Sequence, residues 1–116
     1  MTDNKSLREL QQEVDDWVQS WGGGYWSPMS NLARMIEEVG EVARLVNDQF
    51  GEKPKKPDEA EQDLGMELTD VMYAIICLAN SQGIDLQDSF DRMMEKYRTR
   101  DKFRYVQPDG LYEQEQ

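Results

Sequence analysis

Histidine is absent from this sequence of 116 residues. The absence excludes Ser-His and Cys-His nucleophilic catalysis, and it removes the usual ligands of zinc sites. It also excludes the Glu-x-x-His ligand pairs that bind iron in some helical bundles. A metal site in this chain would therefore be built from carboxylate oxygens, and such a hard ligand set suits Mg²⁺ or Mn²⁺.

Cysteine and long apolar segments are also scarce. Cys77 is the single cysteine, so no intramolecular disulfide can form, which fits a reducing compartment. The first five residues contain no apolar segment of the kind found in signal peptides. The longest apolar run, residues 71–79, is too short to span a bilayer. We therefore expect a cytoplasmic protein that has no membrane partner.

Basic residues are outnumbered by acidic ones. The sequence has 13 lysines and arginines against 24 aspartates and glutamates, which gives a formal net charge of −11. This balance argues against a nucleic acid or an anionic membrane surface as the main partner.

Hydrophobic periodicity and capping residues predict four helices and no strand, so we expect an all-α, four-helix bundle-like subunit. Ser6 followed by Glu9 is a capping-box pattern, Pro28 suits a first helical turn, and Asp85 is a typical N-cap. The expected helices begin at residues 6, 27, 58 and 85 and end near residues 21, 50, 82 and 104. They form one domain, residues 1–104, followed by an irregular tail, residues 105–116. At this length a core is modest, and association of copies is a common remedy.

The second helix carries an apolar face that we expect to lie in the core. Its residues are Met29, Leu32, Ala33, Ile36, Val39, Ala43, Val46 and Phe50. Glu38 and Glu41 fall at one border of this face, and Glu37 lies further round the helix. Trp17 and Trp21 on the first helix are likewise expected in the core.

Two acidic pairs stand out, each with a spacing of three residues. Glu38 and Glu41 lie on the second helix, and Glu67 and Asp70 lie on the third. This spacing places both acids of a pair on one side of a helix. The third helix is otherwise apolar, and charges are costly to bury unless they are compensated. A divalent cation is the simplest compensation, whereas surface acids paired with arginines are the alternative.

These acids also form a recognisable pattern. Glu37-Glu38-x-x-Glu41 followed by Glu67-x-x-Asp70 resembles the signature of the MazG-type nucleotide pyrophosphohydrolases, a family of all-α enzymes. The resemblance covers residues 26–104. It implies Mg²⁺-dependent hydrolysis of a nucleoside triphosphate to the monophosphate and pyrophosphate, with Mn²⁺ as a substitute. It also implies a homodimer or a homotetramer. Bound metal would reverse the unfavourable local charge that a polyanionic substrate meets.

The resemblance assigns roles to particular residues. Glu38, Glu41, Glu67 and Asp70 would bind the metal, and either Glu38 or Glu41 would serve as the general base. Lys96 and Arg100 would contact phosphate, Trp26 would stack on the base, and Asn80 would hold the nucleotide. The alternative for the two cations is a solvated helix end that complements the helix dipole.

Two other functions remain open at this stage. One is an acidic helical module that binds a protein partner without catalysis. The other is a relative of the dimeric dUTP diphosphatases that has a narrow substrate choice.

Overall fold

The computed structural model describes residues 4–52, 62–101 and 104. They form four helices, which are α1 (Leu7–Ser20), α2 (Pro28–Phe50), α3 (Leu64–Ser81) and α4 (Leu86–Arg100). The described residues contain no strand, so the expectation of an all-α fold is confirmed. None of the helices in these ranges is long and apolar enough to cross a membrane. The predicted tail, residues 105–116, lies outside the described residues.

Side-chain caps determine where the helices begin. Ser6 and Glu9 form the predicted capping box, and Ser27 caps α2 with Pro28 in its first turn. Asp85 caps α4 as expected. Residue 58, the predicted start of the third helix, lies outside the described residues. Gln62 and Asp63 are not helical, so the prediction of a helix through these two residues is wrong. The side chain of Asp63 accepts a hydrogen bond from the backbone of Gly65 and so fixes the start of α3.

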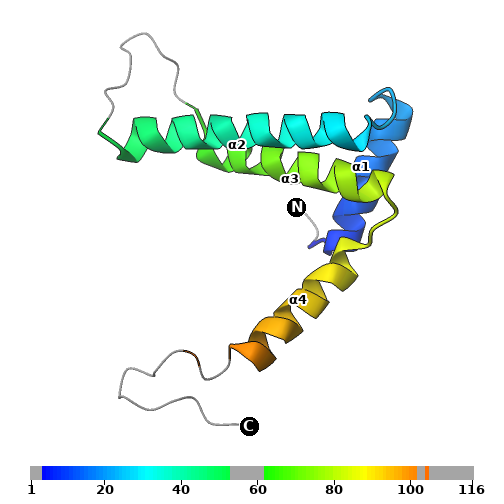
Figure 1. Cartoon of the computed structure of the whole chain (residues 1–116). Helices are drawn as coiled ribbons and strands as arrows, with labels where there is room; N and C mark the ends of the chain where they lie inside the picture. Colours follow the sequence, from blue (N-terminus) through cyan, green and yellow to red (C-terminus); the bar gives the residue numbers. More distant parts are fainter. Residues whose placement is uncertain (1–3, 53–61, 102–103, 105–116) are drawn as a thin grey trace.

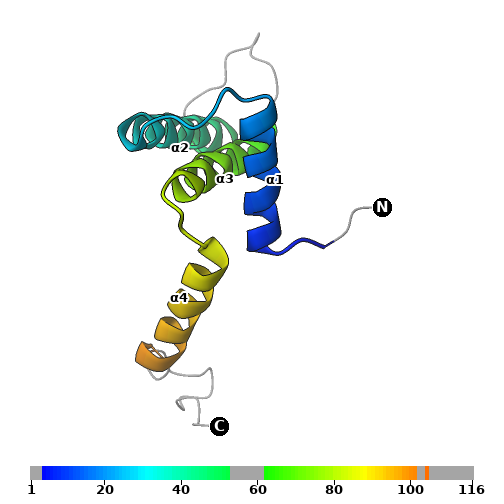
Figure 2. The same ribbon diagram turned by 90° about the vertical axis from the view of Figure 1, so that its right-hand side faces the viewer.

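The helices form an open arrangement in the single chain (Figure 1). α2 and α3 run antiparallel, side by side, and make the most extensive contact between helices. α1 crosses one end of this pair and packs against α3, while α4 packs mainly against α1. In Figures 1 and 2, α4 extends away from the α2–α3 pair. The four helices therefore do not surround one common core.

The core is small, and its hydrophobic residues come from α1, α2 and α3. They are Val18, Leu45, Ala74, Ile76, Cys77 and Ala79. On α2, Asn31 and Leu45 are buried, and Glu38 between them is half-buried, so this side of the helix faces the rest of the chain. The interface between α2 and α3 therefore contains polar side chains in addition to apolar ones.

The apolar face predicted for α2 lies on the other side of that helix and is exposed in the single chain. Met29 and Phe50 at its two ends are each 74% exposed, and Ile36 between them is 63% exposed. The expected burial of this face is therefore not found within one chain, because no described helix covers it. Trp17 and Trp21 are also exposed rather than buried. A continuous exposed apolar stripe of this kind is typical of an interaction surface.

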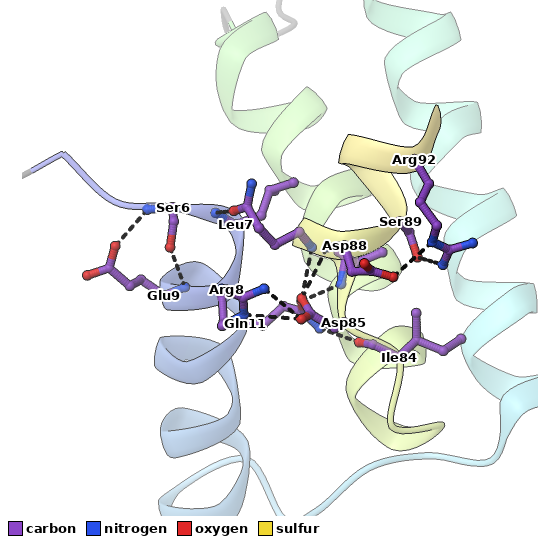
Figure 3. Close-up of polar contacts among 12 residues, drawn as sticks. Ser6, Leu7, Arg8, Glu9, Gln11, Ile84, Asp85, Asp88, Ser89 and Arg92 are labelled. Carbon is purple, nitrogen blue, oxygen red and sulfur yellow. Dashed lines mark hydrogen bonds and ion pairs between the residues drawn. The ribbon is translucent and has the colours of Figure 1, made fainter. Parts of the chain in front are cut away.

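A buried glutamine of α1, Gln11, connects this helix to α3 and to the start of α4. Gln11 is 8% exposed. Its amide nitrogen donates hydrogen bonds to the side-chain oxygen of Asn80 and to the carbonyl of Ile84, each at 2.8 Å. Its amide oxygen accepts from the backbone N–H of Leu86 at 2.8 Å. Figure 3 shows the contact of Gln11 with Ile84 beside the ion pair of Arg8 with Asp85. Gln11 thus fixes the turn between α3 and α4 against α1.

Replacement of Gln11 by leucine should lower the free energy of unfolding by about 2–4 kcal/mol, because several buried polar groups lose their partners. Gln12 is the matched control, since it is exposed and bonds only to Asp16 on its own helix among the described contacts. Gln12→Leu should change the stability by less than about 0.5 kcal/mol. Chemical denaturation of both variants measures the difference, and equal losses would contradict this role of Gln11.

Candidate metal centre

Three carboxylates from two helices meet on the α2–α3 pair. Glu38 extends from α2, and Glu67 and Asp70 extend from α3. One oxygen from each of the three lies within 4.8 Å of an oxygen from the other two. Glu38 and Glu67 are half-buried, whereas Asp70 is exposed. The spacing of three residues on α3 and the antiparallel contact with α2 together produce this cluster.

The cluster suits a hard divalent cation. Two negative charges at this separation repel by about 1–3 kcal/mol, depending on how well solvent screens them. Oxygens that surround Mg²⁺ lie at about 2.0–2.1 Å from the ion, so small side-chain movements would bring all three into ligand positions. The donor set contains only oxygen, in agreement with the absence of histidine.

Glu41, the fourth predicted ligand, lies outside this cluster. Its carboxylate accepts hydrogen bonds from the guanidinium of Arg44, at 2.9 Å from Nη2 and 3.3 Å from Nε. Arg44 also bonds to Gln62. Because Glu41 follows Glu38 by three residues on α2, it lies beside the cluster with a different partner.

Arg34 connects the cluster to two aromatic rings, and the sequence interpretation missed this residue. Its guanidinium lies 4.0 Å from Glu38 and stacks on the rings of Trp26 and Tyr73, at 5.3 Å and 5.2 Å from their centroids. Trp26 is 54% exposed, so part of its ring remains open to a ligand. The sequence signal was the spacing of four residues from Arg34 to Glu38, which allows an ion pair on one helix face.

Asn80 is engaged in contacts within the chain. Its amide nitrogen donates to the backbone carbonyl of Gln11 and to the hydroxyl of Tyr25, each at 3.0 Å. The Tyr25 hydroxyl donates to Asp15 at 2.6 Å. Burial raises the pKa of Tyr25 to about 12, and the bond to Asp15 adds to the shift. These contacts use both amide hydrogens of Asn80, so its expected contact with a nucleotide stays a prediction that the geometry does not favour.

Lys96 and Arg100 lie on α4, which points away from the α2–α3 pair (Figures 1 and 2). Arg100 forms two hydrogen bonds with Asp101, each at 2.9 Å, and both cations stack on the ring of Tyr97. Within one chain, the structure therefore does not bring these two cations to the carboxylate cluster.

Comparison with known proteins identifies the fold and the chemistry. Residues 26–105 match the family model of the MazG nucleotide pyrophosphohydrolase domain. The chain belongs to this family. It is therefore a nucleoside triphosphate pyrophosphatase, an enzyme rather than the non-catalytic interaction module considered above. MazG-type enzymes generally use divalent metal, and the carboxylate cluster is a group that could hold one.

The chain is also similar to proteins of Bacillus subtilis and to solved structures, one of which is named a MazG protein. YpjD of Bacillus subtilis strain 168 is 42% identical over 106 residues, which are 91% of this chain and 96% of YpjD. YvdC of the same organism is 28% identical over 100 residues, 81% of this chain and 94% of YvdC. The crystal structure of B. subtilis YpjD has a TM-score of 0.75 and covers 86% of this chain and 100% of its own. A Bacillus-conserved MazG protein, a nucleotide pyrophosphohydrolase, has a TM-score of 0.72 at 40% identity, with 87% of this chain and 98% of its own covered.

A metal that binds only the folded protein should raise its melting temperature. At a hundredfold excess over the dissociation constant, the stabilisation would be about 2.7 kcal/mol. Asp70→Asn should lose this shift, because the charge of one ligand is removed. Glu37→Gln should keep it, because Glu37 lies outside the cluster on the same helix as Glu38. Melts with Mg²⁺, Mn²⁺ and EDTA at matched ionic strength test this, and identical melts for the unmodified protein would refute the metal centre.

Proposed function

We propose that this enzyme hydrolyses nucleoside triphosphates between the α and β phosphates in the presence of Mg²⁺ and releases the monophosphate and pyrophosphate. The observation that carries the proposal is the convergence of Glu38, Glu67 and Asp70 from two helices. When bound there, Mg²⁺ or Mn²⁺ would neutralise phosphate oxygens and lower the pKa of water. The single cysteine, Cys77, is buried and accords with a cytoplasmic location.

Different residues of the chain would bind the metal and accept the proton in this reaction. Glu38, Glu67 and Asp70 would hold the metal. Glu41 would accept the proton of the attacking water, because its carboxylate lies one turn along α2 and outside the cluster. Water would form a bond to phosphorus while the bond from that phosphorus to the bridging oxygen breaks. Arg44 beside Glu41 would orient its carboxylate for this step.

A second part of the proposal concerns assembly. The exposed stripe of α2 extends from Met29 to Phe50, and copies of the chain would cover it by packing together. In the same homodimer or homotetramer, α4 of one copy would bring Lys96 and Arg100 to the carboxylate cluster of another copy. Support for this arrangement comes from α4, which extends away from the cluster of its own chain (Figure 1).

The division of roles predicts two different losses. Glu67→Gln should lower kcat by about a hundredfold or more and should also abolish the metal-dependent rise in melting temperature. Glu41→Gln should lower kcat by about a hundredfold and leave that rise intact, because a base but no ligand is lost. Chromatography of the products from a panel of standard and modified triphosphates measures kcat and substrate choice. Loss of the metal-dependent rise in Glu41→Gln would instead make Glu41 a ligand, and hydrolysis of dUTP alone would favour the dUTP diphosphatase alternative.

Subunit mixing tests whether a site is shared between copies. Glu67→Gln and Lys96→Met should each be nearly inactive as pure proteins. A mixed dimer contains one intact site, formed by the cluster of the Lys96→Met chain and by Lys96 of the other chain. Co-refolding at equal amounts should therefore restore about a quarter of the unmodified activity in a dimer. Activity no greater than the sum of the two separate variants would contradict a shared site.

A further inference from the structure

A small pocket lies beside the carboxylate cluster. Its volume is about 70 Å³, and the residues used here from its lining are Gly24, Trp26, Asn31, Arg34 and Tyr73. The pocket is thus formed by the loop before α2 that contains Gly24, by the first turns of α2, and by α3. Arg34 ties it to the cluster, since its guanidinium is both a wall of the pocket and the ion-pair partner of Glu38.

Asn31 gives this pocket an unusual property. Its side chain is almost fully buried, at 3% exposure, and its Nδ2 group has no hydrogen-bond partner among the described residues. Most buried amide groups in proteins are paired, because an unpaired one loses its bonds to water without replacement. Because Asn31 lines the pocket, a ligand bound there would supply the missing partner of this buried donor.

The other groups of the pocket suit a planar ligand that carries acceptors. Arg34 offers further N–H donors and stacks on the rings of Trp26 and Tyr73. Trp26 is 54% exposed, so part of its flat ring remains available to a ligand. The hydroxyl of Tyr25, which also lines the pocket, donates its hydrogen to Asp15. Free donors and aromatic walls favour a nucleobase edge on which a carbonyl oxygen is exposed.

We propose that Asn31 determines base specificity by donating a hydrogen bond to a carbonyl oxygen on the base edge far from the sugar. This inference rests on the proposed triphosphate hydrolysis. When the phosphates of the substrate bind at the carboxylate cluster, the base edge far from the sugar is the part that enters the pocket. Bases with a carbonyl at this edge, such as uracil and hypoxanthine, are then preferred. Cytosine and adenine carry an amino group at the equivalent position, and that group is a donor.

Two substrate pairs of equal size isolate this contact. UTP and CTP differ at the 4-position, and ITP and ATP differ at the 6-position, in each case by a carbonyl against an amino group. The unmodified enzyme should show a higher kcat/KM for UTP than for CTP, and for ITP than for ATP. Asn31→Asp replaces the donor with an acceptor of the same shape, so each ratio should fall by about tenfold or more.

Two further variants separate recognition from folding. Asn31→Leu keeps a similar volume without a donor, so both ratios should fall towards one while the melting temperature is maintained or raised. Asn47→Asp introduces the same charge at an exposed position of α2 outside the pocket and should leave both ratios unchanged. If Asn31→Asp does not fold, the ratios for Asn31→Leu decide the question.

The outcomes are distinguishable from a failure of the proposed function. An unmodified enzyme that hydrolyses none of the four triphosphates would refute the proposed function itself. An active enzyme that prefers CTP and ATP would overturn the role of Asn31 alone. The same holds if both ratios in folded Asn31 variants stay within twofold of the ratios of the unmodified enzyme.

Discussion

The antiparallel contact between α2 and α3 is the constraint on which the site depends. It brings Glu38 from one helix against Glu67 and Asp70 from the other, although like charges at this distance repel. The apolar contacts made by Leu45 and Ala74 and by their buried neighbours must hold the pair together despite that repulsion. The helix pair thus stabilises an arrangement of charges that a divalent cation would relieve. The same contact places Arg34 between Glu38 and the aromatic rings of Trp26 and Tyr73.

The two faces of α2 explain why the single chain is open. One face, with Asn31, Glu38 and Leu45, lies against the rest of the chain and carries the polar groups of the site. The opposite face carries the apolar stripe from Met29 to Phe50 and remains exposed. A chain of this size buries a limited fraction of its apolar surface, so a second copy is a natural cover for that stripe. The proposed assembly would also bring Lys96 and Arg100 of α4 close to the carboxylate cluster of another copy.

The sequence allowed the prediction of the helices and of part of the site, for local physical reasons. Ser6 and Asp85 were predicted as caps because capping depends on residues within one turn. Glu67 and Asp70 were predicted to lie together because helical spacing decides it. The start of α3 was missed because the sequence of residues 58–63 also suits a helix, and only the contact of Asp63 with the backbone reveals the cap.

The other differences between the sequence predictions and the structure depend on how the helices pack against one another. α2 has two stripes that each could face a core, and periodicity cannot decide which one the same chain covers. Asn31 resembles any polar residue of a first helical turn, so its burial and its unpaired amide are visible only in the folded chain. Arg34 stacks on Tyr73 from α3, a contact between segments far apart in the sequence. The separation of Glu41 from the cluster likewise depends on Arg44 and on its contact with Gln62, which precedes α3 in the sequence.

The central claim is that Glu38, Glu67 and Asp70 together hold a divalent cation. Anomalous X-ray scattering from crystals soaked in Mn²⁺ locates such an ion directly. We expect an anomalous peak in contact with carboxylate oxygens of all three residues and no peak there in crystals of Asp70→Asn. A peak elsewhere on the protein, or the same peak in the variant, would contradict the account.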